Sequence, residues 1–142
     1  MERLFGALAD RTRLRLLNLM GGQEVCVCYF VEILKTSQPK ISRHLAYLRR
    51  AGVVSARREG KWMHYRMAEP ADPRAARVLA EVRAALAEDR EMKKDLESLR
   101  KVCCSERPPI RLRGAPRPAV PGAALPFPTQ SEPSLRRLRP PN

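Results

Sequence analysis

The sequence predicts a mainly α-helical fold of about five helices with one small β-hairpin. Apolar residues recur at intervals of three and four through most of the first 100 residues, which is the period of an α-helix. Between residues 53 and 67 the period changes to alternation around the turn residues 58–61, as in a hairpin. Directly before this hairpin, two helical patterns are separated only by residues 35–37. Together these observations predict a winged helix-turn-helix.

Three helices are expected before that turn. The first covers residues 1–9, and the second begins after Asp10, whose side chain can accept from the backbone N–H groups of a first turn. A glycine pair ends the second helix near Met20, and a third apolar helix is expected over residues 26–35. The arginines of the second helix are expected to form a solvated surface; they are Arg11, Arg13 and Arg15.

Residues 37–48, SQPKISRHLAYL, predict an amphipathic recognition helix that begins at Ser37 as its N-cap. Ile41, Leu45 and Leu48 lie on its buried side. The side chains that turn away are Lys40, Arg43 and Tyr47, with Gln38, Ser42 and His44 at the edges. Gln, Ser and Arg can read base edges or bind phosphate, so this face suits the major groove of DNA. The alternative is an ordinary amphipathic surface helix.

The hairpin that follows is basic and has the position of a wing. Arg57, Arg58 and Lys61 near its tip are placed to reach a phosphate backbone or a minor groove. Trp62 is expected to pack against the body of the domain, because a large aromatic side chain is stabilised by burial.

One long helix is expected over residues 74–102, after Pro70 and Pro73 break the chain. Asp89 interrupts a heptad-like apolar stripe, whose members are Val82, Ala85, Met92, Leu96, Leu99 and Cys103. This stripe predicts a homodimer through the terminal helices, with two recognition helices about one DNA turn apart. The alternative is that the helix folds back on its own domain.

Composition suggests one domain, residues 1–104, followed by a disordered Pro/Arg-rich tail, residues 105–142. The tail holds ten of the thirteen prolines and seven arginines. Lys and Arg number 28 against 15 acidic residues, a formal charge of +13, which suits a polyanionic partner such as nucleic acid. Ribosomal and membrane-surface proteins share this charge balance.

The four cysteines form two close pairs, Cys26/Cys28 and Cys103/Cys104, a spacing typical of soft-metal binding or redox chemistry in a reducing compartment. The sequence lacks a run of eighteen apolar residues and a signal-peptide pattern, so we expect a cytoplasmic protein without a membrane span. No cysteine lies in a C-x-x-C motif, and no base is placed beside a nucleophile by spacing. An enzyme with a small-molecule substrate or an organic cofactor is therefore not expected.

Three segments resemble the ArsR/SmtB family of winged-helix metalloregulators: LADRTRLRLL at 8–17, EVCVCYFVEIL at 24–34 and SQPKISRHLAYLRRAGVV at 37–54. The resemblance covers roughly residues 4–102. It implies a cytosolic dimeric repressor that holds double-stranded operator DNA in the apo state and releases it when a metal or metalloid binds. The DNA-reading positions that it implies are Ser37, Gln38, Ser42, Arg43 and His44, whereas the wing residues match by place rather than by sequence.

The CVC segment at 26–28 resembles the inducer motif of the arsenic-responsive members. This implies As(III) or Sb(III) as inducer, bound by the thiolates of Cys26 and Cys28, because soft ligands select thiophilic ions. Where the family pattern has Asp-Leu and, in some members, a third cysteine, this chain has Tyr29, Phe30 and Val31. Positions i and i+2 of a helix point about 200° apart, so one ion would join both sulfurs only if the first turn loosened.

The second cysteine pair leaves three interpretations open. Cys103 or Cys104 completes the first site, in one subunit or across the dimer; or the two form a separate site for inorganic or methylated arsenic; or they are structural or redox-active. Cadmium, lead or zinc is an alternative inducer, although residues 74–102 lack the histidine of the family's zinc site. The histidines, His44 and His64, are expected on the recognition helix and the wing. A thiol-redox regulator and a constitutive DNA-binding protein are alternative functions.

Overall fold

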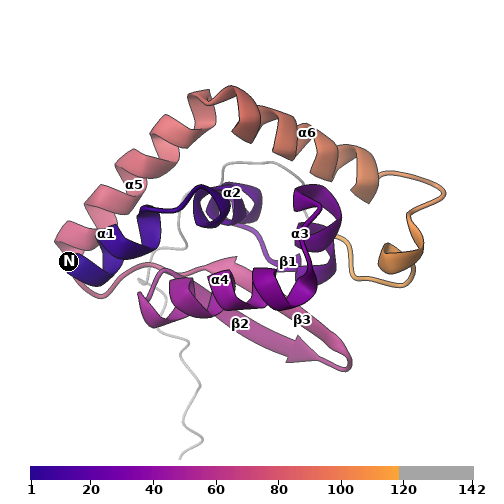
Figure 1. Ribbon diagram of the computed structural model, residues 1–142, viewed down its shortest axis with the longest axis horizontal. Coiled ribbons are helices and arrows are strands. Elements are labelled where there is room, and N and C mark those ends of the chain that lie inside the picture. Colours follow the sequence, from indigo (N-terminus) through magenta and orange to yellow (C-terminus); the bar gives the residue numbers. More distant parts are fainter. Residues whose placement is uncertain (119–142) are drawn as a thin grey trace, which may run out of the picture.

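The computed structural model describes residues 1–118, which form six α-helices and a small antiparallel sheet at one edge of the molecule (Figure 1). The described elements are α1 (Glu2–Leu8), α2 (Arg11–Met20), β1 (Val25–Cys26), α3 (Val27–Leu34), α4 (Gln38–Arg50), β2 (Val54–Glu59), β3 (Trp62–Met67), α5 (Pro73–Glu88), α6 (Arg90–Cys103) and the 3-10 turn η1 (Ile110–Leu112). None of the described helices is long and apolar enough to cross a membrane. The predicted fold class, a winged helix-turn-helix, is confirmed.

The recognition helix forms as predicted, as α4. Ile41, Leu45 and Leu48 are fully buried, and the short turn that follows α3 includes Lys35 in a left-handed conformation. Ser37 has the extended backbone of an N-cap, but its side chain makes no capping hydrogen bond, so the predicted capping contact is wrong. By contrast, the Asp10 side chain accepts from the backbone N–H of Arg13 at 2.9 Å and begins α2 as predicted.

The sheet has the strand order β1-β3-β2, with antiparallel pairing throughout. Gly60, with a φ of 57°, lies in the tight turn of the wing, where Glu59 pairs with Trp62. The two-residue strand β1 was not predicted, since it is too short to show an alternating pattern. It includes Cys26, which the sequence assigned to a helix; that assignment is wrong, because Cys26 is the extended N-cap of α3 and pairs with His64 on β3.

The single long helix predicted after the wing is two helices, α5 and α6, which form a bent arch over α2 (Figure 1). Asp89 ends the first helix with an extended backbone, φ −71° and ψ 132°, and caps the second. Its carboxylate accepts from the backbone N–H groups of Glu91 and Met92 at 2.9 and 3.1 Å. The break that the sequence showed as an interrupted stripe is therefore a helix boundary, stabilised by an N-cap.

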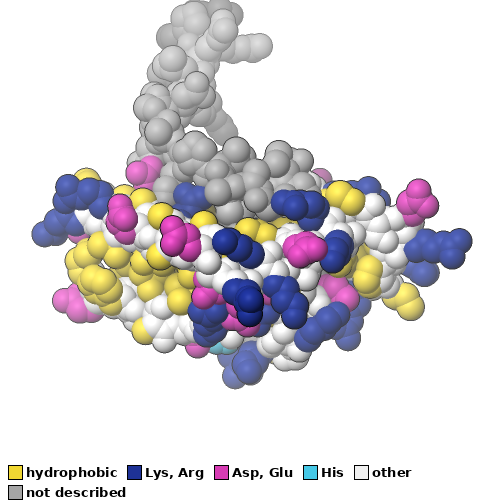
Figure 2. All heavy atoms as spheres, turned by 90° about the horizontal axis from the view of Figure 1, so that it is seen from above, with side chains coloured by type: hydrophobic (Ala, Val, Ile, Leu, Met, Phe, Trp, Pro, Cys, Tyr) yellow, Lys and Arg dark blue, Asp and Glu magenta, His cyan; other side chains and the backbone are white. Residues whose placement is uncertain are grey.

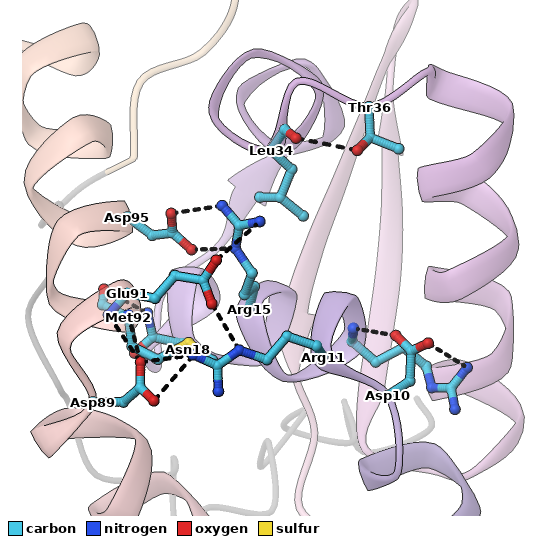
Figure 3. Close-up of polar contacts among 11 residues, drawn as sticks. Asp10, Arg11, Arg15, Asn18, Leu34, Thr36, Asp89, Glu91, Met92 and Asp95 are labelled. Carbon is cyan, nitrogen blue, oxygen red and sulfur yellow. Dashed lines mark hydrogen bonds and ion pairs between the residues drawn. The ribbon is translucent and has the colours of Figure 1, made fainter.

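Arg11 and Arg15 of α2 bind α6 (Figure 3). The prediction of a solvated surface is wrong for Arg13 and Arg15, which are half-buried, whereas Arg11 stays exposed; Arg13 donates to the carbonyls of Gly6 and Ala7. Arg11 donates to Asp89 at 2.9 Å and to Glu91 at 2.7 Å. Arg15 makes a bidentate contact with Asp95, at 2.7 and 2.8 Å, and Asp95 is only 4% exposed. Planar guanidinium groups suit such paired contacts with a carboxylate.

Part of the apolar stripe of the last helices is buried within this chain. Met92 and Leu99 are fully buried and Cys103 is 5% exposed, which matches the alternative in which α6 folds back on its own domain. The apolar side chains that stay exposed include Met1 and Phe5 of the N-terminal region, at 41% and 53% exposure. Figure 2 shows apolar side chains gathered at this end of the molecule, where α1 and the start of α5 lie in Figure 1.

The chain continues past α6 along the body of the domain. Leu112 in η1 is 3% exposed and belongs to the same hydrophobic core as Phe30 of α3. Leu112 and Ala115 therefore join the core, although the sequence placed the domain boundary at residue 104. The rest of the predicted tail, residues 119–142, lies outside the described residues.

Candidate DNA-reading surface and thiol site

The start of the recognition helix presents an exposed polar face. Four of the predicted DNA-contacting side chains, one at the N-cap and three on α4, are exposed: Ser37, Gln38, Lys40 and Arg43. Ser42 is half-buried at the edge of this face. His44 is half-buried as well, and its Nδ1 lies 3.6 Å from Oδ1 of Asp10, so it faces the start of α2. The structure thus leaves four of these six side chains fully available to a partner.

The three predicted cations of the wing differ in their surroundings. Arg57 donates to Glu24, with its Nε 3.2 Å from Oε1, and this contact raises the pKa of Arg57 and lowers that of Glu24. The ion pair ties the wing to the segment that leads into β1. Arg58 is exposed and donates to the Gly60 carbonyl at 3.2 Å. Arg58 therefore stays at the wing surface, whereas Arg57 is held by an acid.

The third wing cation, Lys61, lies over the face of Trp62, with its Nζ 4.9 Å from the ring centroid. Lys61 is exposed, and Trp62 is half-buried against the hydrophobic core. The predicted packing of Trp62 on the body of the domain is thus confirmed. Attraction between the ammonium group and the electron-rich ring face thus holds Lys61 beside Trp62.

Cys26 and Cys28 converge at the start of α3, where their Sγ atoms lie 2.9 Å apart. Because Cys26 has an extended backbone, the 200° separation expected for a regular helix does not apply, and no loosening of the first turn is required to bring the sulfurs together. Cys26 is 1% exposed, while Cys28 is half-buried. The structure therefore forms a two-thiol site at the junction of β1 and α3.

The two thiols differ in acidity. The hydrogen bond with Cys28 lowers the pKa of Cys26 to about 7, despite the opposing effect of burial. The same contact raises the pKa of Cys28, and burial adds to that effect. The contact therefore favours the thiolate form of Cys26, and thiolate is the form that binds soft ions.

His64 and Glu24 connect this thiol site to the wing, and sequence analysis missed the connection. His64 lies opposite Cys26 in the β1–β3 pairing and is 4% exposed. Its Nδ1 lies 3.7 Å from Glu24 and its Nε2 lies 3.2 Å from Glu59. The pairing of the two-residue strand β1 with β3 brings Cys26 and Glu24 to His64, while the β2–β3 hairpin brings Glu59. No sequence pattern reports the pairing of so short a strand as β1.

The second cysteine pair lies at the end of α6. Cys103 is buried, and burial raises its pKa, whereas Cys104 is exposed. Tyr29 of α3 lies near both pairs: its pKa is raised to about 12 by burial first and then by the thiols of Cys103 and Cys28. Within residues 1–118, no three His, Cys, Asp or Glu side chains are grouped closely enough to hold a metal ion. The four cysteines predicted as metal ligands therefore form two pairs, Cys26/Cys28 and Cys103/Cys104.

Comparison with known proteins agrees with this architecture. Residues 10–56 match the family described as "Bacterial regulatory protein, arsR family". The chain is 47% identical over 79 residues to the arsenical resistance operon repressor of Escherichia coli, covering 55% of this chain and 68% of the relative. It is 51% identical over 65 residues to the arsenic resistance transcriptional regulator ArsR1 of Pseudomonas putida, covering 45% of this chain and about half, 51%, of that relative.

Solved structures share the fold. HlyU from Vibrio cholerae matches with a TM-score of 0.52 and 27% identity, over 61% of this chain and 90% of HlyU. The homodimeric winged helix-turn-helix DNA-binding domain of Mb0332 from Mycobacterium bovis matches with a TM-score of 0.50 and 32% identity, over 61% of this chain and 78% of that domain. The printed description of the Mb0332 domain, a winged helix-turn-helix, agrees with the fold of this chain. The chain belongs to the arsR family of bacterial regulatory proteins.

Proposed function

We propose that this protein is a transcriptional repressor that binds double-stranded operator DNA as a homodimer and is released when trivalent arsenic or antimony binds the thiolates of Cys26 and Cys28. The observation that carries the proposal is the convergence of these two sulfurs, 2.9 Å apart, where β1 meets α3. The arsenic-related names of relatives that are 47% and 51% identical support it. In this proposal the protein is not an enzyme, uses no organic cofactor and acts in the cytoplasm.

The DNA-reading role rests on the exposed face of α4 and on the wing. Arg43 is exposed on this face, and its guanidinium can bind a guanine edge in a bidentate manner. Lys40 and Arg58 are exposed and bind backbone phosphate in this proposal. Ser42 and His44 stay at the edge of the interface, because both are half-buried.

The thiol pair suits a soft trivalent ion. Such an ion exchanges hydroxide for thiolate sulfur, and the proton of each thiol leaves with that hydroxide as water. Since the pKa of Cys26 is about 7, the first sulfur binds at neutral pH with little cost of deprotonation. Cys26 is 1% exposed and belongs to the hydrophobic core, so its sulfur lies in an environment of low polarity. In this proposal Cys103 and Cys104 form a separate two-thiol site.

The position of the thiol pair supplies a route to both DNA-reading elements. Cys26 is paired with His64 on the strand of the wing, and α3, which Cys26 caps, packs against α4. Binding of an ion to both sulfurs therefore changes the geometry of β1 relative to β3 and of α3 relative to α4. A tenfold loss of operator affinity requires a difference of only about 1.4 kcal/mol between the two states.

The proposed dimer is supported by the exposed apolar side chains of Met1 and Phe5 at the N-terminus, together with the homodimeric state stated for the Mb0332 domain. Phe5 is 53% exposed, and α5 adds the half-buried Val82 and the exposed Ala85 of the predicted stripe. A two-fold dimer through α1 and α5 would present two recognition helices to one near-palindromic operator. Residues of α6, which pack inward, stay with their own domain.

A thiol-redox regulator is the second candidate, because the same 2.9 Å contact and the lowered pKa of Cys26 favour oxidation of the pair. Formation of a disulfide would remove two electrons and two protons from the thiols, which hydrogen peroxide would take up as it is reduced to water. The wing and α3 would respond to this bond as they would to a bridging ion. Oxidation and metalloid binding must therefore be compared on the same protein.

The test is fluorescence anisotropy of the reduced protein on the duplex that it selects from a random-sequence pool. We expect release by arsenite, and no release by arsenite in Cys26→Ser and Cys28→Ser variants that keep their DNA affinity. Separate titrations with antimonite, zinc, cadmium and lead define the inducer, and hydrogen peroxide tests the redox candidate. Release by peroxide alone would support the redox function, and stable binding under every condition would contradict both sensing functions.

A further inference from the structure

The segment that follows α6, residues 105–118, leads from the Cys103/Cys104 pair toward the wing. Leu112 fixes it to the hydrophobic core beside α3, with 3% exposure. Gly114, with a φ of 78°, passes the wing: a Cβ at this position would lie 4.0 Å from Cζ2 of Trp62. Both contacts follow Arg111, the exposed residue that directly precedes Leu112, so the segment is anchored on the C-terminal side of Arg111.

These anchors place Arg111 at a groove of about 530 Å³ between the recognition helix and the wing. Ser37 and Gln38 line it from the start of α4, and Lys61 and Trp62 line it from the wing. The groove thus combines two cations with hydroxyl and amide groups that can donate hydrogen bonds. None of the described residues that line it is acidic.

We propose that Arg111 is a further DNA-binding residue, which residues 105–118 hold in this groove to bind a backbone phosphate of the operator. A guanidinium fork binds phosphate oxygens through two parallel N–H groups, and Lys61 of the wing adds a second cation to the lining of the groove. The elements on both sides of the groove are the two that reach DNA in the proposed function, on which this inference rests. Leu112 is the positioning residue, because its burial fixes the backbone next to Arg111.

The groove also reaches the thiol site, because Cys28 lines it together with Arg111. A phosphate bound in the groove and an ion bound to Cys28 would therefore occupy neighbouring positions. Arg111 thus contributes a contact in the DNA-bound state. This contact lies next to the thiol site, and an ion bound there releases the DNA in the proposed function.

The test compares Arg111→Ala with Arg107→Ala in the full chain. Arg107 is exposed on the same segment, does not line the groove, and its substitution changes the net charge equally. For a dimer that loses two phosphate contacts, we expect about tenfold weaker binding in Arg111→Ala, on both selected and random duplexes, and a salt-dependence slope that is smaller by about two. Arg111→Lys should restore part of the affinity, and Arg107→Ala should change neither quantity.

Leu112→Ala provides a second variant, since it keeps the charge of Arg111 and releases its anchor. We expect it to lose the same part of the salt dependence, with α-helical circular dichroism retained. Equal effects of Arg111→Ala and Arg107→Ala would overturn the inference and leave the proposed function intact. A wild-type protein that binds no duplex DNA would overturn the proposed function and the inference together.

Discussion

The contact between Arg15 and Asp95 gives the most direct test of how the last helix is held. Asp95 is 4% exposed and accepts from Nε and Nη2 of Arg15 at 2.7 and 2.8 Å (Figure 3). In Asp95→Asn, one of these N–H groups would face an amide NH₂ group in place of an acceptor. Loss of one partner from a buried ion pair costs about 3–5 kcal/mol. The Arg15 side chain is 22% exposed and lies 3.6 Å from Glu91, so we expect a smaller loss, about 2–3 kcal/mol.

Thermal unfolding followed by circular dichroism measures this loss. For a domain of this size the expected decrease in Tm is about 8–12 °C. Glu97→Gln is the matched control on the same helix, because Glu97 pairs with Lys101 at 2.9 Å while both side chains are largely exposed. Its expected cost is below about 0.5 kcal/mol. Equal decreases in Tm for the two variants would show that the Arg15–Asp95 pair does not hold α6 on α2.

Three further predictions concern DNA, the thiol pair and the dimer. Arg43→Ala should weaken binding to the selected duplex by about 1–3 kcal/mol and binding to random DNA less; equal losses in anisotropy titrations would contradict base reading. Cys28→Ala should raise the pKa of Cys26 from about 7, because the Cys28 hydrogen bond lowers it, so thiolate absorbance at neutral pH should fall; an unchanged titration would refute that cause. Phe5→Glu should shift sedimentation toward the monomer, whereas Ile110→Glu, at a 79% exposed site outside α1 and α5, should not; a dimer that persists in Phe5→Glu would place the interface elsewhere.

Sequence patterns predicted the parts of the candidate site that depend on neighbours along the chain. The exposure of Gln38 and Arg43 follows from helical spacing, because Ile41 and Leu45 must face the core. The two cysteine pairs were likewise visible as pairs. The ion pair between Arg57 and Glu24 was not visible in the sequence, because a two-residue strand brings Glu24 near.

The convergence of the thiols likewise depends on a contact between distant segments and not on neighbours along the chain. Residue spacing alone places Cys26 and Cys28 on opposite sides of a helix, and the structure brings their sulfurs to 2.9 Å because β1 captures Cys26. The pairing of β1 with β3 joins positions about 40 residues apart, as Cys26 and His64 show. Such a contact depends on the packing of the whole domain, and no local period encodes it.

The sequence by itself determined the helix-turn-helix, the wing and the cap at Asp10, because hydrophobic period, turn residues and caps act within a few positions. Only the tertiary structure decided which ion pairs the charged side chains form and in which direction the chain continues after α5. Asp89 ends a helix while it also binds Arg11, and Leu112 joins the core beyond the predicted boundary. These choices depend on burial and on charge pairing between distant segments, which a linear pattern does not record.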